Sequence, residues 1–116
     1  MITTQTFREL ALAFDEAEEL PHFEKASFRV KKKIFATLNE KQQRATLKLS
    51  ENDQSIFSLY GDKTAVFPVP NKWGKQGWTQ FLLDKVDEEF FSDALTAAYC
   101  EVAPKNLAAK YVLSEP

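Results

Sequence analysis

Hydrophobic and polar residues alternate through three consecutive segments between residues 23 and 50. Alternation places successive side chains on opposite faces of a β-strand, so this pattern predicts three strands joined by short turns. Strands joined by short turns pair antiparallel. One face of these strands is expected to carry the apolar residues Ala26, Phe28, Val30, Ile34, Ala36, Leu38, Ala45, Leu47 and Leu49.

The turn between the first two of these strands falls at Lys31 and Lys32. A two-residue type I′ turn requires a positive φ at both positions, which favours asparagine, aspartate and glycine rather than lysine. We therefore expect a slightly longer or bulged turn at this point in the chain.

The first part of the chain has a helical rather than an alternating pattern. Apolar residues recur at helical spacing at Phe7, Leu10, Ala11 and Phe14. Thr3 or Thr4 can cap the N-terminus of this helix. We predict that the helix ends near residues 18–21, because the residue before Pro21 is driven toward extended geometry.

Shorter elements follow the three predicted strands. The pattern indicates a short helix over residues 50–61, strands over 64–69 and 78–84 with a loop over 70–77 between them, a longer helix over 87–102, and a short helix beginning at Pro104. The predicted order is therefore α-β-β-β-α-β-β-α-α. We expect one α+β domain over residues 1–116, with an antiparallel sheet of about five strands and helices packed on one face.

The composition is that of an ordinary globular domain. The chain has 116 residues, of which 44% are hydrophobic and 13% aromatic, which is enough for one packed core. Its single cysteine, Cys100, excludes an intrachain disulfide and suits a reducing compartment. No secretory signal pattern or membrane-length apolar run is recognisable. These features predict a cytoplasmic protein with no membrane partner.

The basic residues are concentrated in the predicted strands. Residues 21–50 contain eight of the fifteen lysines and arginines but only two acids, although the net charge is −2. Alternation predicts that Lys25, Arg29, Lys33, Phe35, Arg44 and Lys48 lie on the face opposite the helices. Such a face could follow a phosphate backbone while Phe35 stacks on a base. The alternative is a solvated surface on which lysines blunt sheet edges.

A second candidate region surrounds the two tryptophans. Residues 67–79 contain both tryptophans and two of the three glycines of the chain. Glycine permits a positive φ or a close backbone approach, so this segment could form a shaped binding loop or simply a tight, packed turn. The candidate ligand or interaction residues here are Trp73, Gly74, Lys75, Gly77 and Trp78.

His22 is the only histidine of the chain and the third candidate. It could act as a general base, or bind a ligand together with the tryptophan loop. However, a multi-histidine metal site is excluded, and no nucleophile motif or phosphate-binding glycine loop is present. We therefore expect no catalytic residues, no metal and no cofactor.

Several stretches together resemble a known family. They are PHFEKASFRV from Pro21, KIFATL from Lys33, LKLS from Leu47, FPVP from Phe67, WGKQGWT from Trp73 and VAPK from Val102. The chain resembles the MmcQ/YjbR family of small bacterial proteins over nearly its whole length. The resemblance implies an antiparallel α+β domain, described as CyaY-like or double-wing, and the label of a predicted DNA-binding protein. It supplies no catalytic residues.

Three functional hypotheses remain open. The first is a non-enzymatic binding module for nucleic acid, DNA in particular, which uses the basic sheet face. The second is an adaptor that binds another protein through the sheet face or the tryptophan loop. The third is a small-ligand site near His22 and the tryptophan loop, which would require a pocket joining His22 to Trp73 or Trp78.

Overall fold

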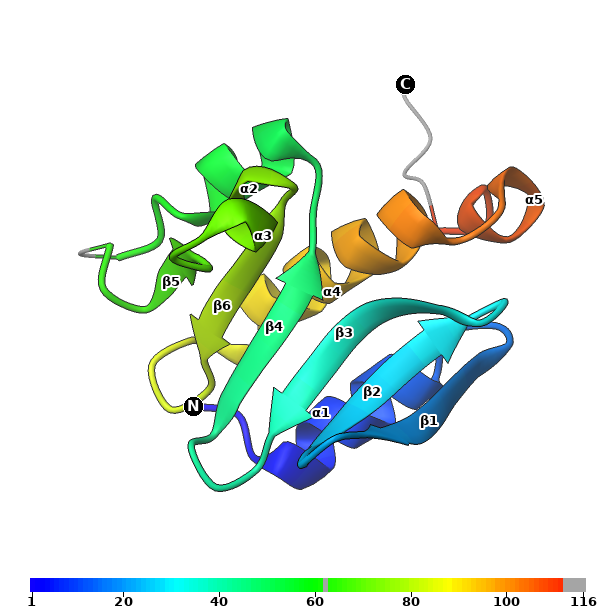
Figure 1. Ribbon diagram of the computed structural model, residues 1–116, viewed down its shortest axis with the longest axis horizontal. Coiled ribbons are helices and arrows are strands. Elements are labelled where there is room, and N and C mark those ends of the chain that lie inside the picture. Colours follow the sequence, from blue (N-terminus) through cyan, green and yellow to red (C-terminus); the bar gives the residue numbers. More distant parts are fainter. Residues whose placement is uncertain (62, 112–116) are drawn as a thin grey trace.

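The computed structural model describes residues 1–61 and 63–111 (Figure 1). The strands within these residues are β1 (Ala17–His22), β2 (Lys25–Val30), β3 (Lys33–Asn39), β4 (Arg44–Lys48), β5 (Val66–Pro68) and β6 (Trp78–Leu82). The helices are α1 (Thr4–Leu12), α2 (Glu51–Phe57), α3 (Lys72–Lys75), α4 (Glu88–Val102) and α5 (Lys105–Ala108). The strands form one antiparallel sheet in the order β1-β2-β3-β4-β6-β5. This arrangement confirms the predicted α+β class and the predicted sequence of elements, with two additions. One is a strand, and the other is α3, a short helix within residues 70–77, which were predicted to form a loop.

The additional strand is β1. It was not predicted because the helical pattern of the N-terminal segment was extended through residues 18–21. Helix α1 ends at Leu12, and Glu16 takes a φ of 60° before the chain enters the sheet. β1 then pairs along its whole length with β2, from Ala17 opposite Val30 to His22 opposite Lys25. Pro21 is tolerated because β1 is an edge strand and needs no N–H donor on its free side. The predicted continuation of the helix to residues 18–21 is therefore wrong.

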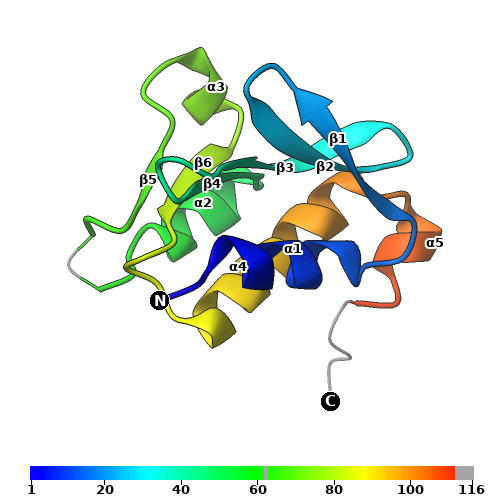
Figure 2. The same cartoon turned by 90° about the horizontal axis from the view of Figure 1, so that it is seen from below.

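The core lies between the sheet and helices α1 and α4, which cover the same face (Figure 2). Phe7 of α1 packs edge-on against Phe28 of β2, with 5.0 Å between the ring centroids. Phe91 of α4 contacts both Phe7 and Phe81, at 5.5 and 5.6 Å. The residues of α4 at helical spacing are buried, namely Phe91, Ala94, Leu95, Ala98 and Tyr99. Burial of these side chains is the main stabilising contribution to the fold.

An irregularity in β3 breaks the strict alternation that the sequence suggested. Phe28 lies opposite Ala36 but Arg29 lies opposite Ile34, so Phe35 is an extra residue in a β-bulge. Phe35 and Ala36 are both fully buried. The ring of Phe35 packs edge-on against Tyr99 at 5.5 Å, which accounts for its place in the core. Ile34 lies on the opposite face instead.

The turn between β2 and β3 is shorter than expected. Val30 pairs directly with Lys33, and the two residues between them, Lys31 and Lys32, have φ values of 50° and 70°. Both lysines therefore adopt the left-handed geometry of a two-residue turn. Lys31 also forms an ion pair with Glu16, at 2.6 Å between Nζ and Oε1. The expectation of a longer turn was wrong, and the bulge lies within β3 instead.

Candidate functional site

The sheet face opposite α1 and α4 is bordered by two raised segments, as Figure 2 shows. One is the hairpin that joins β1 to β2, and the other is α3 with the chain that joins it to β5 and β6. Between them lies a cavity of about 350 Å³, which we call the open-face groove. The groove is lined by His22, Lys25, Ile34, Thr37, Thr46, Val69, Trp73, Trp78 and Gln80.

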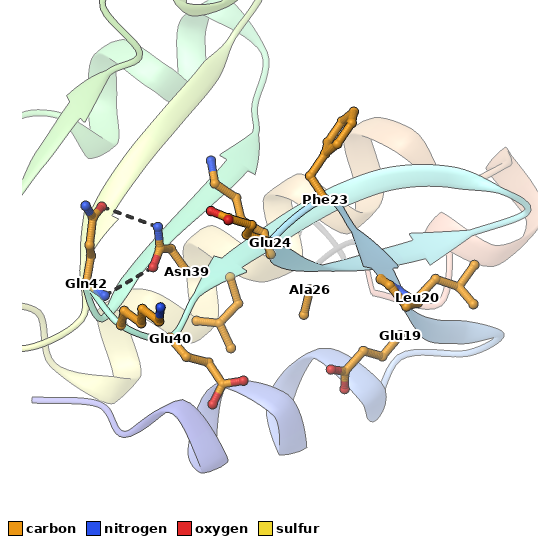
Figure 3. A pocket seen from close by; sticks show the side chains of 12 residues that line it. Glu19, Leu20, Phe23, Glu24, Ala26, Asn39, Glu40 and Gln42 are labelled. Atoms are coloured by element: carbon orange, nitrogen blue, oxygen red, sulfur yellow. Dashed lines mark hydrogen bonds between the residues drawn. The ribbon is translucent and has the colours of Figure 1, made fainter.

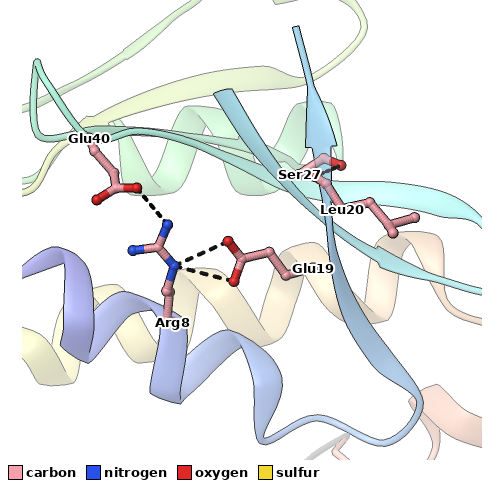
Figure 4. A network of polar contacts seen from close by, with 5 residues as sticks. All are labelled: Arg8, Glu19, Leu20, Ser27 and Glu40. Carbon is pink, nitrogen blue, oxygen red and sulfur yellow. Dashed lines mark hydrogen bonds and ion pairs between the residues drawn. The ribbon is translucent and has the colours of Figure 1, made fainter. Parts of the chain in front are cut away.

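The floor of the groove carries a row of three uncharged polar side chains beside the apolar side chain of Ile34. Thr37 lies opposite Thr46, and Thr46 lies opposite Gln80, so these three side chains form a row across adjacent strands. Ser27 continues the row on β2 but is fully buried, and its hydroxyl donates to the backbone oxygen of Leu20 at 2.9 Å (Figure 4). Hydroxyl and amide groups can both donate and accept hydrogen bonds, so this floor suits a polar ligand.

Four cationic residues frame this polar row. β2 and β4 run in the same direction because both pair antiparallel with β3. Lys25 and Arg44 begin these strands and therefore lie on one side of the row. Arg29 and Lys48 lie near the ends of the same strands and therefore lie on the other side of the row. The strand register thus brings together four of the five bases that were predicted to share a face.

These cations differ in their surroundings. Arg44 is half-buried, its guanidinium lies 6.0 Å from the centre of the Phe67 ring, and Nη1 donates to Gln80 at 3.4 Å. Nζ of Lys48 lies 3.7 Å from a carboxylate oxygen of Glu101, which partly balances its charge. Within residues 1–61 and 63–111, no carboxylate forms an ion pair with Lys25, Arg29 or Arg44.

Two of the predicted face residues do not belong to it. Phe35 is fully buried, so its prediction as an exposed stacking residue is wrong. The bulge turns the side chain of Phe35 toward the core, so Phe35 and Ala36 are both buried there. Lys33 is exposed, but it lies opposite the core residue Val30 and therefore on the other face of the sheet from Arg29.

The raised segment that contains α3 and both tryptophans forms one wall of the groove, which we call the tryptophan wall. Close contacts of its backbone hold it in place. A Cβ atom on Gly74 would lie 2.0 Å from the oxygen of Val69, and one on Gly77 would lie 1.8 Å from the oxygen of Leu49. Nε2 of Gln54, on α2, donates to the backbone oxygen of Gly74 at 2.9 Å and to Oγ1 of Thr79 at 3.0 Å. Both glycines therefore shape the wall, and neither of them lines the cavity.

The tryptophans themselves face the groove. Trp73 is 50% exposed and Trp78 is half-buried, and both line the cavity. Lys75, predicted with them, is exposed on α3 but does not line the cavity. Gln54 was missed by sequence reasoning, because a glutamine on a short polar helix carries no signal that it supports a loop twenty residues away.

His22 lies on the opposite wall and lines the same cavity as both tryptophans. This is the pocket that the small-ligand hypothesis required. The nearby hydroxyls, those of Thr37 and Thr46, belong to the floor described above. Cys100 lies on α4, on the other side of the sheet, where burial raises the pKa of its thiol. His22 and Cys100 therefore do not form a catalytic pair.

A larger hollow of about 670 Å³ lies beside the hairpin tip, near the β3–β4 turn (Figure 3). Its lining mixes the carboxylates of Glu19, Glu24 and Glu40 with the ammonium groups of Lys25 and Lys41. A surface of mixed charge gives no preference for a polyanion.

Two carboxylates from this hollow are held in a structural ion-pair network (Figure 4). Arg8 of α1 bonds Glu19 at 3.1 Å and Glu40 at 2.6 Å. The hydrogen bond from Arg8 lowers the pKa of Glu40, and the same contact raises the pKa of Arg8. This network joins α1 to β1 and to the β3–β4 turn, so its evident role is to support the fold.

Other classes of site find no support in the described part of the chain. No group of three or more histidine, cysteine, aspartate or glutamate side chains is placed to hold a metal ion there. Likewise, none of the helices in that part is long and apolar enough to cross a membrane.

The sequence and the fold agree with one known family. A family model described as YjbR matches residues 12–101. The chain belongs to the YjbR family. Among solved structures, it is similar to the YjbR-type protein DR2400 of Deinococcus radiodurans, described as a DUF419 domain, with a TM-score of 0.78 and 20% sequence identity. That similarity covers 98% of this chain and 91% of DR2400, and it shows a shared fold. No curated protein matches the chain.

Proposed function

We propose that this YjbR-family chain is a non-enzymatic binding module that holds nucleic acid in the open-face groove. The observation that carries the proposal is the frame of Lys25, Arg29 and Arg44 around an uncharged polar floor, on a sheet face that α1 and α4 leave open. Cations spaced along a groove can follow the phosphates of a nucleic acid backbone. The family resemblance to predicted DNA-binding proteins points the same way.

An exposed aromatic side chain in the groove also supports the binding of nucleic acid. Trp73 is half exposed beside the cations, so it takes the stacking role first assigned to Phe35. Stacking on an aromatic side chain is tolerant of sequence because every base has a π-face. Since the chain as a whole has a net charge of −2, we expect attraction to be confined to the groove.

The test is a titration of a fluorescently labelled oligonucleotide at two salt concentrations. Three phosphate contacts predict that affinity falls roughly 20-fold between about 50 and 200 mM salt. Lys25→Glu should weaken binding strongly, and Lys25→Glu with Arg44→Glu should abolish it. Lys105→Glu is the matched control, because Lys105 is equally exposed but lies on α5, outside the groove. Absence of binding at low salt, or equal effects of Lys25→Glu and Lys105→Glu, would refute the proposal.

A second candidate function is a small-ligand site in the same cavity. The observation that favours it is that His22, Trp73 and Trp78 line one cavity. Binding of a free mononucleotide, followed by the fluorescence of the tryptophans, tests this alternative. Saturable quenching by the mononucleotide that is as tight as binding of an oligonucleotide would favour the small ligand over the polymer.

A further inference from the structure

We infer that the open-face groove accepts single-stranded rather than duplex nucleic acid, with one unpaired base seated in the cavity between His22 and Trp73. This inference rests on the proposed function and specifies the form of nucleic acid that is bound. It follows from the size of the cavity, the chemistry of its walls and floor, and the position of the cations.

The cavity has the size and the walls of a site for one flat heterocycle. Its volume of about 350 Å³ lies at the lower end of the range for small-molecule sites, which suits one base with part of its sugar. His22 and Trp73 come from opposite walls, and the half-buried Trp78 also lines the cavity. Aromatic rings in a cationic groove are the usual platforms for unstacked bases.

The floor supplies hydrogen-bonding partners for the edge of a base. Thr37, Thr46 and Gln80 lie side by side on three adjacent strands. Nη1 of Arg44 donates to the side-chain oxygen of Gln80 at 3.4 Å, which orients that amide. Hydroxyl and amide groups can pair with the donors and acceptors of a base edge, but only when that edge is not already paired in a duplex.

The cations lie where the backbone of such a base would emerge. Lys25 lines the cavity itself, and Arg44 lies beside Gln80 at the edge of the floor. A strand with one base in the cavity can therefore place its neighbouring phosphates near these charges. A duplex could offer the same phosphates, but it would first have to extrude a base at the cost of its pairing and stacking.

The larger hollow near the hairpin tip is a weaker choice for a base. Its lining includes Glu19, Glu24 and Glu40, which repel phosphates. Phe23 at its rim is 94% exposed and projects away from the ribbon (Figure 3). The ring of Phe23 lies 4.9 Å from that of His22, so Phe23 is not independent of the groove. Leu59 is 62% exposed and does not line the cavity, so it provides the control outside the open-face groove.

The experiment compares three labelled ligands of equal length: a single strand, its duplex, and an abasic single strand with the same phosphates but no bases. We expect the single strand to bind about 10- to 100-fold more tightly than the abasic strand, and more tightly than the duplex. Trp73→Ala should remove this preference over the abasic strand without changing abasic binding. Leu59→Ala, outside the groove, should leave the preference intact.

The outcomes separate this inference from the proposed function. Equal binding of the normal and abasic strands, at an affinity that falls with salt, would overturn the base site while leaving phosphate binding in place. Absence of binding by every oligonucleotide at low salt would overturn both. A free mononucleotide that binds as tightly as the single strand would also overturn the inference, in favour of a small ligand.

Discussion

The two walls of the open-face groove are held in place by different kinds of interaction. The tryptophan wall is fixed by close backbone packing and by hydrogen bonds between uncharged groups, made by Gly74, Gly77 and Gln54. The opposite wall, which we call the hairpin wall, is formed by β1 and β2. An ion pair between Arg8 and Glu19 joins it to α1. The same groove thus has one wall set by steric fit and one that depends in part on ionised carboxylates.

This difference predicts which substitutions and conditions should affect each wall. A steric constraint is insensitive to pH and salt, but it fails abruptly when an atom is added. An ion pair near the surface contributes modestly, and it depends on protonation and ionic strength. Each prediction below changes one wall and leaves the other as its internal reference.

The largest effect is expected from Gly77→Ala. The added Cβ would lie 1.8 Å from the backbone oxygen of Leu49, at a φ of 103° that alanine rarely adopts. Relief requires movement of backbone, so we expect a loss of about 3–5 kcal/mol in the free energy of unfolding, measured by urea denaturation. Gly61→Ala is the matched control, because Gly61 also has a positive φ, of 56°, but nothing lies within 4 Å of an added Cβ.

The control should cost only the strain of the left-handed backbone, about 1–2 kcal/mol. Equal losses for Gly61→Ala and Gly77→Ala would show that backbone conformation alone matters. The close approach between the tryptophan wall and the end of β4 would then not be a determinant of the groove.

A smaller effect is expected from Gln54→Ala. The substitution removes the donor to Gly74, Trp78 and Thr79, and we expect a loss of about 1–3 kcal/mol in the free energy of unfolding. The emission of Trp73 should shift because its loop loses support from α2. Asn52→Ala on the exposed side of the same helix is the control, and it should change neither the stability nor the emission.

Unchanged tryptophan emission in a folded Gln54→Ala protein would contradict the role assigned to Gln54. The tryptophan wall would then be held by its glycine contacts alone.

The smallest effect is expected from the pH dependence of the Arg8 network, which joins α1 to the hairpin wall through Glu19 and to the β3–β4 turn through Glu40. The hydrogen bond from Arg8 lowers the pKa of Glu40 below its ordinary value of 4.5. Because the folded pKa is lowered, this contact stabilises the fold fully above pH 4.5 and loses its contribution as the pH falls through the lowered value. Glu40→Gln should therefore lower the melting temperature slightly at neutral pH and not at all in strong acid.

Subtracting the Glu40→Gln curve from that of the unmodified chain isolates this contact, since Asp15 and Asp87 also have lowered pKa values and contribute to acid unfolding. Glu24→Gln at the hairpin tip is the control, because within the described residues Glu24 forms no ion pair. A Glu40→Gln difference that is the same at every pH would exclude the charge of Glu40 as its cause.

Much of the fold could be predicted because its signals are local. Strands β2, β3 and β4 alternate in sequence, and Asp87, where the longer helix was predicted to begin, caps α4 by accepting from the N–H of Phe90. β1 was missed because nothing in residues 17–22 favours a strand until β2 lies beside it. Phe35 was misplaced because a bulge changes the side-chain face by one residue, and only packing against Tyr99 decides where it falls.

The walls of the candidate site were anticipated as one of three hypotheses, but its floor was not. His22, Trp73 and Trp78 were singled out as unusual residues, and they line one cavity. Its floor was not foreseen as part of that cavity, because Thr37, Thr46 and Gln80 are ordinary strand residues whose alignment depends on pairing between β3, β4 and β6.

By itself, the sequence determined which segments alternate, where the long helix begins, and that basic residues gather in the central strands. These are properties of neighbouring residues, which periodicity and capping express directly. The tertiary structure alone decided the sixth strand, the inward turn of Phe35 and the meeting of His22 with the tryptophans. Each of these depends on residues far apart in the chain, and contacts of that kind are made only when the sheet is assembled.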